Sequence, residues 1–291
     1  MTTTFEIDGM RVDRIIEGEY PFMPAADFLP GLTPEILAEN RGWMRAARAL
    51  DERDWLVLCI QSYVIRTPHL NIMVDTCVGN HKPRPTRPIW HEKTDGHYMH
   101  ALAAAGLRVE DIGLVMCTHL HVDHVGWNTR LLDGRWVPTF PNAKYLFADK
   151  EFAYWEAENA KAPVLPFQDS VLPIVAANRH QLVSSAHELN DHIRLLPTPG
   201  HTPDHFAVAI GRGRDAGVIT GDLIHTALQA RYPEMSMRAD VDPVQSGATR
   251  RAFLERYCDT DTQCCTAHFP SPSRARIRRW GDGFKCEPIA G

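Results

Sequence analysis

Residues 119–124 bring three histidines and one aspartate together in the sequence His-Leu-His-Val-Asp-His. The apolar run 114–117 precedes them and is typical of a buried strand. In an extended segment alternate side chains share a face, so His119, His121 and Asp123 are predicted to point the same way. His124 is out of step and would reach a second point where the chain turns. Imidazole and carboxylate are the usual ligands of zinc and related cations, so this segment predicts a site for two neighbouring metal ions.

Three further residues of ligand type follow other predicted strands. His201 stands in the turn Pro-Gly-His-Thr-Pro, after the apolar stretch 193–196. Asp222 closes the segment Val-Ile-Thr-Gly-Asp, and His268 closes the short stretch Thr-Ala-His. Loops that follow strands are the usual place for functional residues, because a rigid scaffold positions them. These three candidates would complete the ligand set of two ions.

The order of these elements resembles the metallo-β-lactamase superfamily. The matching features are the HxHxDH segment, the histidine of Pro-Gly-His-Thr, the aspartate of Thr-Gly-Asp and the late His268. Asp75, in Ile-Met-Val-Asp-Thr, resembles the early aspartate that ends a strand in this superfamily. The resemblance implies an α/β fold, the four-layer αβ/βα sandwich, in which two mixed sheets pack face to face with helices outside.

The resemblance also implies how the ligands are shared. Two divalent ions per chain are expected, most plausibly zinc, with manganese, iron and cobalt as alternatives. Asp75 is expected to support the ligands through hydrogen bonds. The family pattern assigns one ion to His119, His121 and His201, the other to Asp123, His124 and His268, and the bridging position to Asp222.

A binuclear hydrolase of this kind uses a hydroxide that bridges the metal ions to open a lactone or to cleave a small ester. Asp123 is expected to relay a proton to the leaving oxygen. His225 stands three residues after Asp222, where acyl-homoserine lactonases typically carry tyrosine. This departure resembles the methyl parathion hydrolase branch and its lactonase or esterase relatives. His225 is therefore predicted either to donate a hydrogen bond to the developing oxyanion or to pack on the metal ligands.

Five apolar side chains near these segments are candidates for a substrate rim. A rim of this kind would suit a lactone, an aryl ester or an organophosphate better than a highly charged substrate. The alternative is that they are ordinary core residues. They are Phe22, Met23, Phe28, Trp127 and Phe269.

Other activities stay open at this point. An organophosphate triester hydrolase would share the ligands, and so would a thioesterase of the hydroxyacylglutathione hydrolase type. The latter usually adds a basic site, for which the cluster Arg274, Arg276, Arg278 and Arg279 is a candidate; otherwise this cluster is read as a solvated helix face. A mononuclear iron persulfide dioxygenase also has HxHxDH, but the additional His268 argues against it.

Composition bounds the class of protein. The formal net charge of −5 gives no general attraction to nucleic acid or to an anionic membrane surface. The N-terminus lacks a basic start and an apolar segment, and no apolar run approaches ~18 residues, so neither a signal peptide nor a membrane span is expected. Seven cysteines without a disulfide spacing favour the reducing cytoplasm. The expected partner is a small-molecule substrate, and the sequence leaves open whether the protein forms a homodimer.

Residues 1–291 are predicted to form a single domain, in which residues 1–50 are an N-terminal extension that contributes to the substrate rim. No linker or repeat divides the chain. Helices are expected at 33–50, 98–105, 150–158 and 243–257. Strands are expected in a hairpin over 5–12 and at 55–66, 71–75, 143–147, 206–210 and 218–220.

Overall fold

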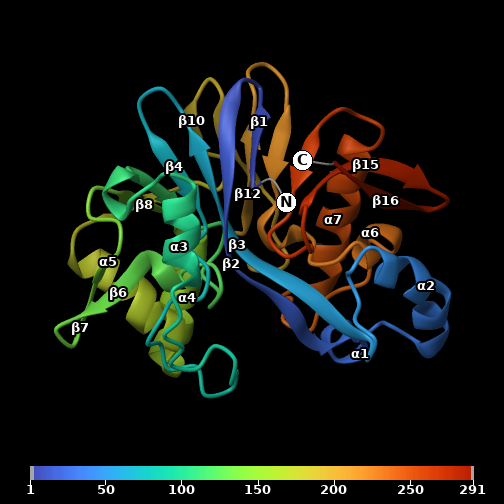
Figure 1. Cartoon of the computed structure of the whole chain (residues 1–291), viewed down its shortest axis with the longest axis horizontal. Helices are drawn as coiled ribbons and strands as arrows, with labels where there is room; N and C mark the ends of the chain where they lie inside the picture. The colour runs from blue at the N-terminus through green and yellow to red at the C-terminus, as the bar shows by residue number, and fades with distance from the viewer. Residues whose placement is uncertain (1–2, 290–291) are drawn as a thin grey trace. The chain divides into compact units, whose positions relative to one another are not determined.

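Two long strands, β2 (Met10–Pro24) and β3 (Trp55–Arg66), each belong to two units of the chain. The computed structural model describes residues 3–289 (Figure 1). The motif unit consists of Thr3–Glu17 and Ile60–Ser185, and the C-terminal unit consists of Gly18–Cys59 and residues 186–289. Each unit holds part of the predicted ligand set, so each is described by itself.

The motif unit is built on a mixed sheet with the strand order β1-β2-β3-β4-β5-β8-β9. Its first strands pair antiparallel, whereas β4, β5, β8 and β9 run parallel. Buried parallel strands read as continuous apolar runs, as β5 does. Besides β2 and β3, the strands are β1 (Thr4–Ile7), β4 (Asn71–Val74), β5 (Leu114–Met116), β8 (Lys144–Ala148) and β9 (His180–Val183), with a separate hairpin of β6 (Thr129–Leu132) and β7 (Arg135–Pro138).

The C-terminal unit has a second mixed sheet, with the order β10-β11-β12-β13-β14-β15-β16. All its neighbours pair antiparallel except β13 and β14, which are parallel. The strands are β10 (Glu188–Asn190), β11 (Ile193–Pro197), β12 (Phe206–Ile210), β13 (Gly217–Ile219), β14 (Gln263–Cys265), β15 (Arg274–Trp280) and β16 (Gly283–Pro288).

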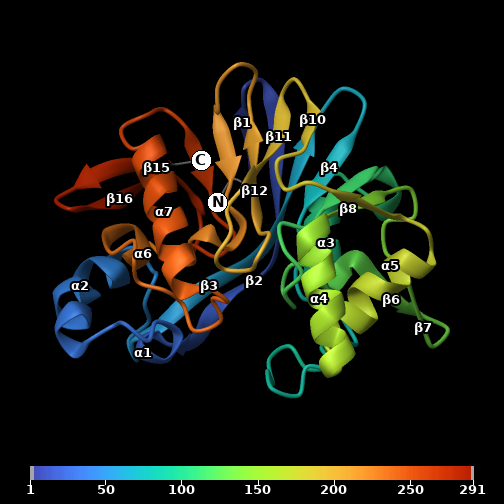
Figure 2. The same cartoon turned by 180° about the vertical axis from the view of Figure 1, so that it is seen from behind.

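Helices cover the sheets. In the motif unit α4 (Asp149–Lys161) packs on β8 and β9, and the unit also contains α3 (His97–Ala104) and α5 (Leu172–Ala176). In the C-terminal unit α7 (Pro243–Tyr257) packs on β15 and α6 (Leu228–Arg231) packs on β16 (Figure 2). The C-terminal unit also contains α1 (Ala25–Phe28) and α2 (Pro34–Ala46). Short 3-10 or π turns lie in the motif unit at Val109–Asp111, Gly126–Asn128 and Phe167–Val171, and in the C-terminal unit at Gly221–Leu223.

The starts of α2 and α7 follow from their capping residues. The Thr33 hydroxyl accepts the Ile36 N–H at 3.3 Å, and Pro34 occupies the first helical position. Asp242 accepts the Gln245 N–H at 2.9 Å and is likewise followed by proline. A side-chain acceptor satisfies an exposed backbone donor, and proline has the φ that a first turn needs. Both helices therefore begin where the sequence predicts them.

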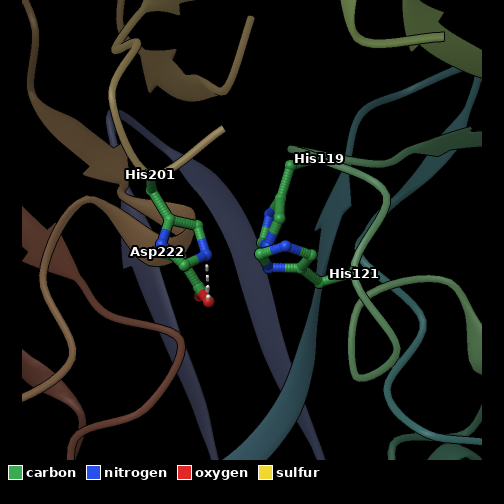
Figure 3. A group of neighbouring side chains, drawn as sticks. All are labelled: His119, His121, His201 and Asp222. Carbon is green, nitrogen blue, oxygen red and sulfur yellow. Dashed lines mark ion pairs between the residues drawn. The ribbon is translucent and has the colours of Figure 1, made fainter. Parts of the chain in front are cut away.

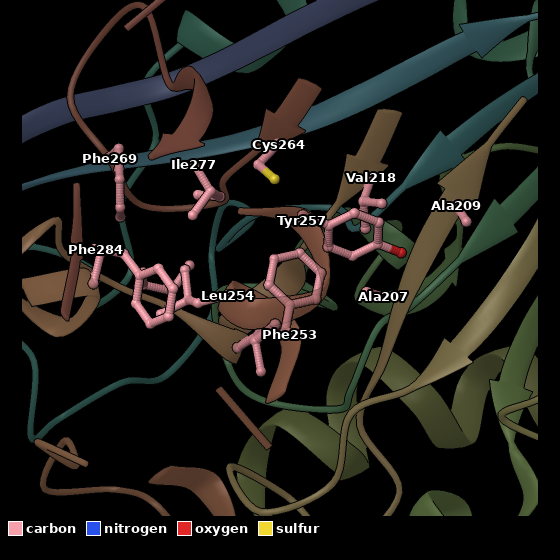
Figure 4. Close-up of a cluster of buried hydrophobic side chains, with 13 residues drawn as sticks. Ala207, Ala209, Val218, Phe253, Leu254, Tyr257, Cys264, Phe269, Ile277 and Phe284 are labelled. Atoms are coloured by element: carbon pink, nitrogen blue, oxygen red, sulfur yellow. The ribbon is translucent and has the colours of Figure 1, made fainter. Parts of the chain in front are cut away.

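The core of the C-terminal unit lies between α7 and its sheet (Figure 4). The helix contributes Phe253, Leu254 and Tyr257 at helical spacing, which places these three side chains on one face. Apart from Phe284 on β16, the strands contribute small or branched residues, so the bulky helix side chains fit against them. This packing fixes α7, which matters because α7 also carries a buried arginine described below. The strand and loop residues of this core include Ala207, Ala209, Val218, Cys264, Phe269, Ile277 and Phe284.

Most predicted elements are present within a few residues, but two interpretations are wrong. The arginine cluster 274–279 lies on the strand β15 and not on a helix. The histidine motif is not an extended segment, because β5 ends at Met116 and the His124 N–H donates to the His121 carbonyl across a turn. The alternating side-chain directions of a strand therefore do not predict where the side chains of the motif point. Among residues 3–289 no helix combines the length and the apolar character needed to cross a bilayer.

Candidate metal centre

The histidine motif and Asp75 leave their sheet at the same edge. The strands β4 and β5 are parallel, with Val74 opposite Met116, so the residues that follow both strands meet in space. The Asp75 carboxylate accepts the Thr118 N–H at 2.7 Å and the Thr118 hydroxyl at 2.9 Å. Asp75 has a positive φ of 59°, a backbone state that non-glycine residues adopt at a cost. The start of the motif loop is thus anchored to a buried carboxylate.

Hydrogen bonds determine which ring nitrogen of two motif histidines carries the proton. His124 Nδ1 lies 2.9 Å from Asp75 Oδ2, and a carboxylate only accepts, so Nδ1 carries the proton. The Thr118 hydroxyl gives its own proton to Asp75, so its oxygen accepts from His119 Nδ1, 3.1 Å away. In both rings the lone pair is therefore on Nε2, the atom that a neutral imidazole offers to a metal ion.

The rest of the motif is held from α4. Glu151, which is buried, accepts the Leu120 N–H at 3.2 Å and the Trp155 indole N–H at 2.7 Å. The Trp155 ring meets the His121 ring edge-on, with their centroids 5.3 Å apart. The rings of His119 and His121 lie 4.6 Å apart and come from the same loop (Figure 3). Helix α4 thus orients the middle of the motif, whereas β4 orients its two ends.

In the C-terminal unit three loops leave one edge of the sheet. Ile219 of β13 lies opposite Cys265 of the parallel strand β14, so the Asp222 and His268 loops start side by side. The His201 turn joins β11 to β12 at the same edge, because Val208 of β12 also lies opposite Ile219. The strand pairing therefore brings together ligand candidates that are far apart in sequence.

Glycine is required in the His201 turn. Gly200 has a φ of +129°, and a Cβ there would lie 2.3 Å from the backbone nitrogen of Ser246. Only glycine combines this conformation with such close approach to another segment. The Pro-Gly-His sequence thus seats His201 directly against the first turns of α7.

The Asp222 carboxylate is surrounded by histidines of its own unit. His201 Nε2 and His225 Nε2 lie 3.3 and 3.1 Å from Asp222 Oδ2, and His268 Nε2 lies 2.9 Å from Oδ1. Figure 3 shows the His201 ring beside this carboxylate. Asp222 and His268 thus form, with His225, a group whose ligand atoms all lie within 4.8 Å of one another. The two oxygens of Asp222 face different histidines, an arrangement suited to a bridging carboxylate.

The far nitrogens of His201 and His268 bind acceptors. His201 Nδ1 donates to Asp240 Oδ1 at 2.8 Å, and His268 Nδ1 donates to the Cys59 carbonyl at 2.9 Å. Their Nε2 atoms therefore face Asp222, and Nε2 is the atom that each ring would offer to a metal ion on losing a proton. His205 supports Asp222 in another way, since its Nε2 accepts the Asp222 N–H at 2.9 Å. Imidazoles oriented through Nδ1, together with a carboxylate, fit divalent zinc or a similar ion.

Charges in this unit are strongly coupled. Burial opposes a charge on His201, but the hydrogen bonds that the ring donates to Asp222 and Asp240 outweigh it and raise the His201 pKa to about 9. Burial lowers the pKa of His225, although Asp222 lies beside it. Burial would raise the pKa of Asp240, but the hydrogen bond to His201 prevails and lowers it. The Asp240 carboxylate thus stays charged, and His225 stays neutral at pH 7.

The five predicted rim residues lie in different surroundings. Phe28 meets the His225 ring edge-on at 5.5 Å, and Phe22 meets Phe28 at 6.2 Å. Met23 is buried in the same cluster, and Phe269 is buried in the core of Figure 4. Trp127, in the motif unit, is buried, stacks on Tyr98 and donates its indole N–H to Glu17. Phe22 is the most exposed of the five, and it is the first candidate for contact with a substrate.

Three supporting residues have no signal in the sequence. Asp240, Thr118 and Glu151 are all buried, and each accepts a hydrogen bond from a ligand residue or from the loop that carries one. None of them belongs to a motif of ligand spacing. A buried carboxylate is recognised only when the fold shows which histidine it contacts.

Comparison with known proteins agrees with this geometry. A match to an N-acyl homoserine lactonase of Bacillus cereus is 27% identical over 111 residues and covers 38% of this chain and 37% of that protein. A lactonase from a Bacillus species is 26% identical over 118 residues, and 40% of each protein is covered. The chain thus spans well under half the length of the curated lactonases that it matches.

Solved structures extend the comparison to nearly the whole chain, and a family model matches the larger part of it. AidC, a dizinc quorum-quenching lactonase in complex with the product N-hexanoyl-L-homoserine, superposes with a TM-score of 0.79, 20% identity and coverage of 99% of this chain and 97% of AidC. The hydrolase AbOPH gives a TM-score of 0.81 with the same identity and coverages. The fold is therefore the metallo-β-lactamase fold, with mixed sheets and helices. Residues 60–268 match the model of that family. The chain belongs to the metallo-β-lactamase superfamily.

Proposed function

We propose that the chain is a binuclear metal-dependent hydrolase of ester bonds, with zinc as the metal. His119, His121 and His201 would hold one ion, Asp123, His124 and His268 the other, and Asp222 would bridge them. The observation that carries this proposal is the Asp222 carboxylate, whose two oxygens face His201 and His268 separately. The hydrogen bonds that orient four ligand histidines through Nδ1 support it further.

The bound ions would polarise a substrate carbonyl and supply an activated water near neutral pH. Asp123 is the carboxylate we propose for proton relay to the leaving oxygen. Its side chain is 14% exposed, against 5% for Asp222, so it is the more accessible of the two. Asp75 would hold His124 directly and His119 through Thr118. His225 would donate a ring N–H hydrogen bond to the developing oxyanion.

A lactone or a small ester is the proposed substrate. The curated relatives are N-acyl homoserine lactonases, and AidC binds the product of such a reaction. Phe22 and Phe28 place aromatic surface next to His225, as an apolar acyl or aryl group would require. An organophosphate triester is the second candidate, because a histidine stands where acyl-homoserine lactonases typically carry tyrosine.

We further propose that both units act as one hydrolase domain, in which residues 1–50 contribute to the rim through Phe22 and Phe28. The ligands come from both units, so neither unit has the complete set. We also propose a cytoplasmic location, because seven cysteines without a disulfide spacing suit a reducing compartment.

Metal analysis and a substrate panel test the proposal. The purified protein should contain two zinc ions per chain and should lose activity on chelation and regain it with zinc. N-hexanoyl homoserine lactone, a γ-lactone, p-nitrophenyl acetate, paraoxon and S-lactoylglutathione distinguish the candidate substrates. In the same assays Asp123→Asn should retain zinc and lose rate about 10²–10⁴-fold if it relays a proton. One ion in the fully active chain, or activity that survives chelation, would contradict the binuclear mechanism.

A further inference from the structure

A buried arginine lies behind the ligands of the C-terminal unit. Arg250, on α7, has a side chain that is 0% exposed. Its Nε donates to the Leu223 carbonyl at 2.8 Å, and one terminal nitrogen, Nη1, donates to the Pro233 and Met235 carbonyls at 2.6 and 3.1 Å. A further nitrogen donates to the Ser246 hydroxyl at 2.8 Å. The guanidinium thus ties together segments that are distant in sequence.

One branch of this network leads to His201. Arg250 lies 3.7 Å from Asp240 Oδ2, and that oxygen also accepts the Met237 N–H at 3.0 Å. The other oxygen, Oδ1, accepts from His201 Nδ1. The backbone after Asp240 adds two bonds, since the Val241 and Asp242 N–H groups donate to the His201 and Gly200 carbonyls. Asp240 is therefore fixed on one side by Arg250 and fixes His201 on the other.

Two more branches lead to Asp222 and His225. Leu223, whose carbonyl accepts from Arg250, directly follows Asp222 in the turn Gly221–Leu223. The Met235 carbonyl, also bound by Arg250, accepts the Gln229 amide at 2.9 Å, and the Gln229 oxygen accepts the His225 N–H at 2.8 Å. Gln229 is fully buried. Each of the three site residues is thus reached from Arg250 through short hydrogen bonds or one ion pair.

We propose that Arg250 and Asp240 are positioning residues that hold His201 and the Asp222 turn in register for metal binding. A buried guanidinium is costly unless it is paired and fully hydrogen-bonded, so its place here calls for a function in fixing geometry. Its planar fork reaches four acceptors in different directions, which a lysine ammonium on one flexible stem cannot do. This inference rests on the metal centre proposed above.

Zinc affinity and cobalt spectra of two variants test the inference. In Asp240→Asn an amide replaces a group that accepts on both oxygens, so His201 loses its fixed orientation. We expect the ion that His201 binds to be held about 10–100-fold more weakly, as for other partners of ligand histidines. Arg250→Lys should weaken the binding of both ions, because Asp222 would bridge them. The visible spectrum of the cobalt-substituted protein should change in each variant, since it reports ligand geometry.

Matched controls separate position from chemistry. Arg251→Lys changes the adjacent arginine, which pairs with Glu234 at the surface, and Asp242→Asn changes a cap that asparagine replaces well. Both should match the wild type. If Arg250→Lys does not fold by circular dichroism, Asp240→Asn decides. Wild-type affinity and cobalt spectrum in folded Asp240→Asn would overturn this inference alone. Failure of the wild type to bind two ions would overturn the proposed function and this inference with it.

Discussion

At the scale of single residues, ligand candidates are readable from the sequence and their supports are not. His119, His201 and Asp222 stand in short motifs whose residue types have few structural explanations. Asp240 and Arg250 are ordinary in the sequence and become informative only through their buried contacts. The reason is physical, because a hydrogen bond between distant segments depends on the tertiary fold.

His225 is the residue on which the oxyanion role depends. Burial keeps its ring neutral, and its single ring proton lies on Nε2, 3.1 Å from Asp222. We expect His225→Ala to lower kcat for esters or lactones roughly 10²–10³-fold, the usual loss for such a donor. Zinc content should not change, because His201, Asp222 and His268 all remain. Steady-state kinetics with metal analysis check this, and full kcat would leave His225 a packing role only.

At the scale of elements, capping residues and apolar runs predict where helices and strands lie better than they predict the conformation of the loops between them. Thr33 and Asp242 start helices where expected, and β3 and β12 match their predicted ranges. The conformation of the histidine motif is not readable in this way, because an apolar run does not show where a strand ends and a turn begins. Strand β5 is only three residues long, and Glu151 of α4 and Asp75 set the loop that follows it.

Helix α4 should therefore matter for metal binding although it carries no ligand. Glu151→Ala would leave the buried Leu120 N–H and the half-buried Trp155 indole N–H without their acceptor, which costs about 1–3 kcal/mol. We expect lower stability in urea and weaker zinc binding by His121. Glu156→Ala, an exposed change on the same helix, is the control and should match the wild type. Unchanged zinc affinity in folded Glu151→Ala would show that α4 does not position the motif.

At the scale of the whole molecule, the contacts divide the chain into two compact units, and the single domain expected from the sequence stays a prediction. That division is invisible in the sequence, because β2 and β3 run through it without a linker. The motif unit also buries a lysine side chain. In the motif unit Lys82 is fully buried, donates to the Thr129 hydroxyl at 2.7 Å and lies 3.7 Å from the centre of the Trp136 ring.

Lys82 makes the stability of the fold dependent on pH. Burial lowers its pKa from 10.5 to about 7, although Asp169 opposes this shift. Between these two values the unfolded chain holds a proton that the folded chain lacks, so folding stability from this group rises with pH and is lost as pH falls to 7. Relative to Lys82→Met, the free energy of unfolding of the wild type should rise by up to ~1.4 kcal/mol for each unit of pH increase in this window.

Urea unfolding at pH 7, 8 and 9 with saturating zinc measures this difference. Lys144→Met, an exposed change on β8 of the same unit, is the control and should run parallel to the wild type. Other titrating groups are common to all three proteins and cancel. Parallel curves for the wild type and Lys82→Met would show that Lys82 keeps its ordinary pKa in the fold.

The parallel pairing of β13 with β14 has a consequence for the order of folding. Antiparallel neighbours can join through a short turn, but a parallel pair must wait for its crossover, which here contains α6 and α7. Closing so long a loop is slow, so this pairing belongs to a late stage of folding. Asp222 and His268 become neighbours only through it. In the proposed centre the metal ions would therefore bind to a chain that has already folded, because a nascent chain that carries only the histidine motif still lacks Asp222 and His268.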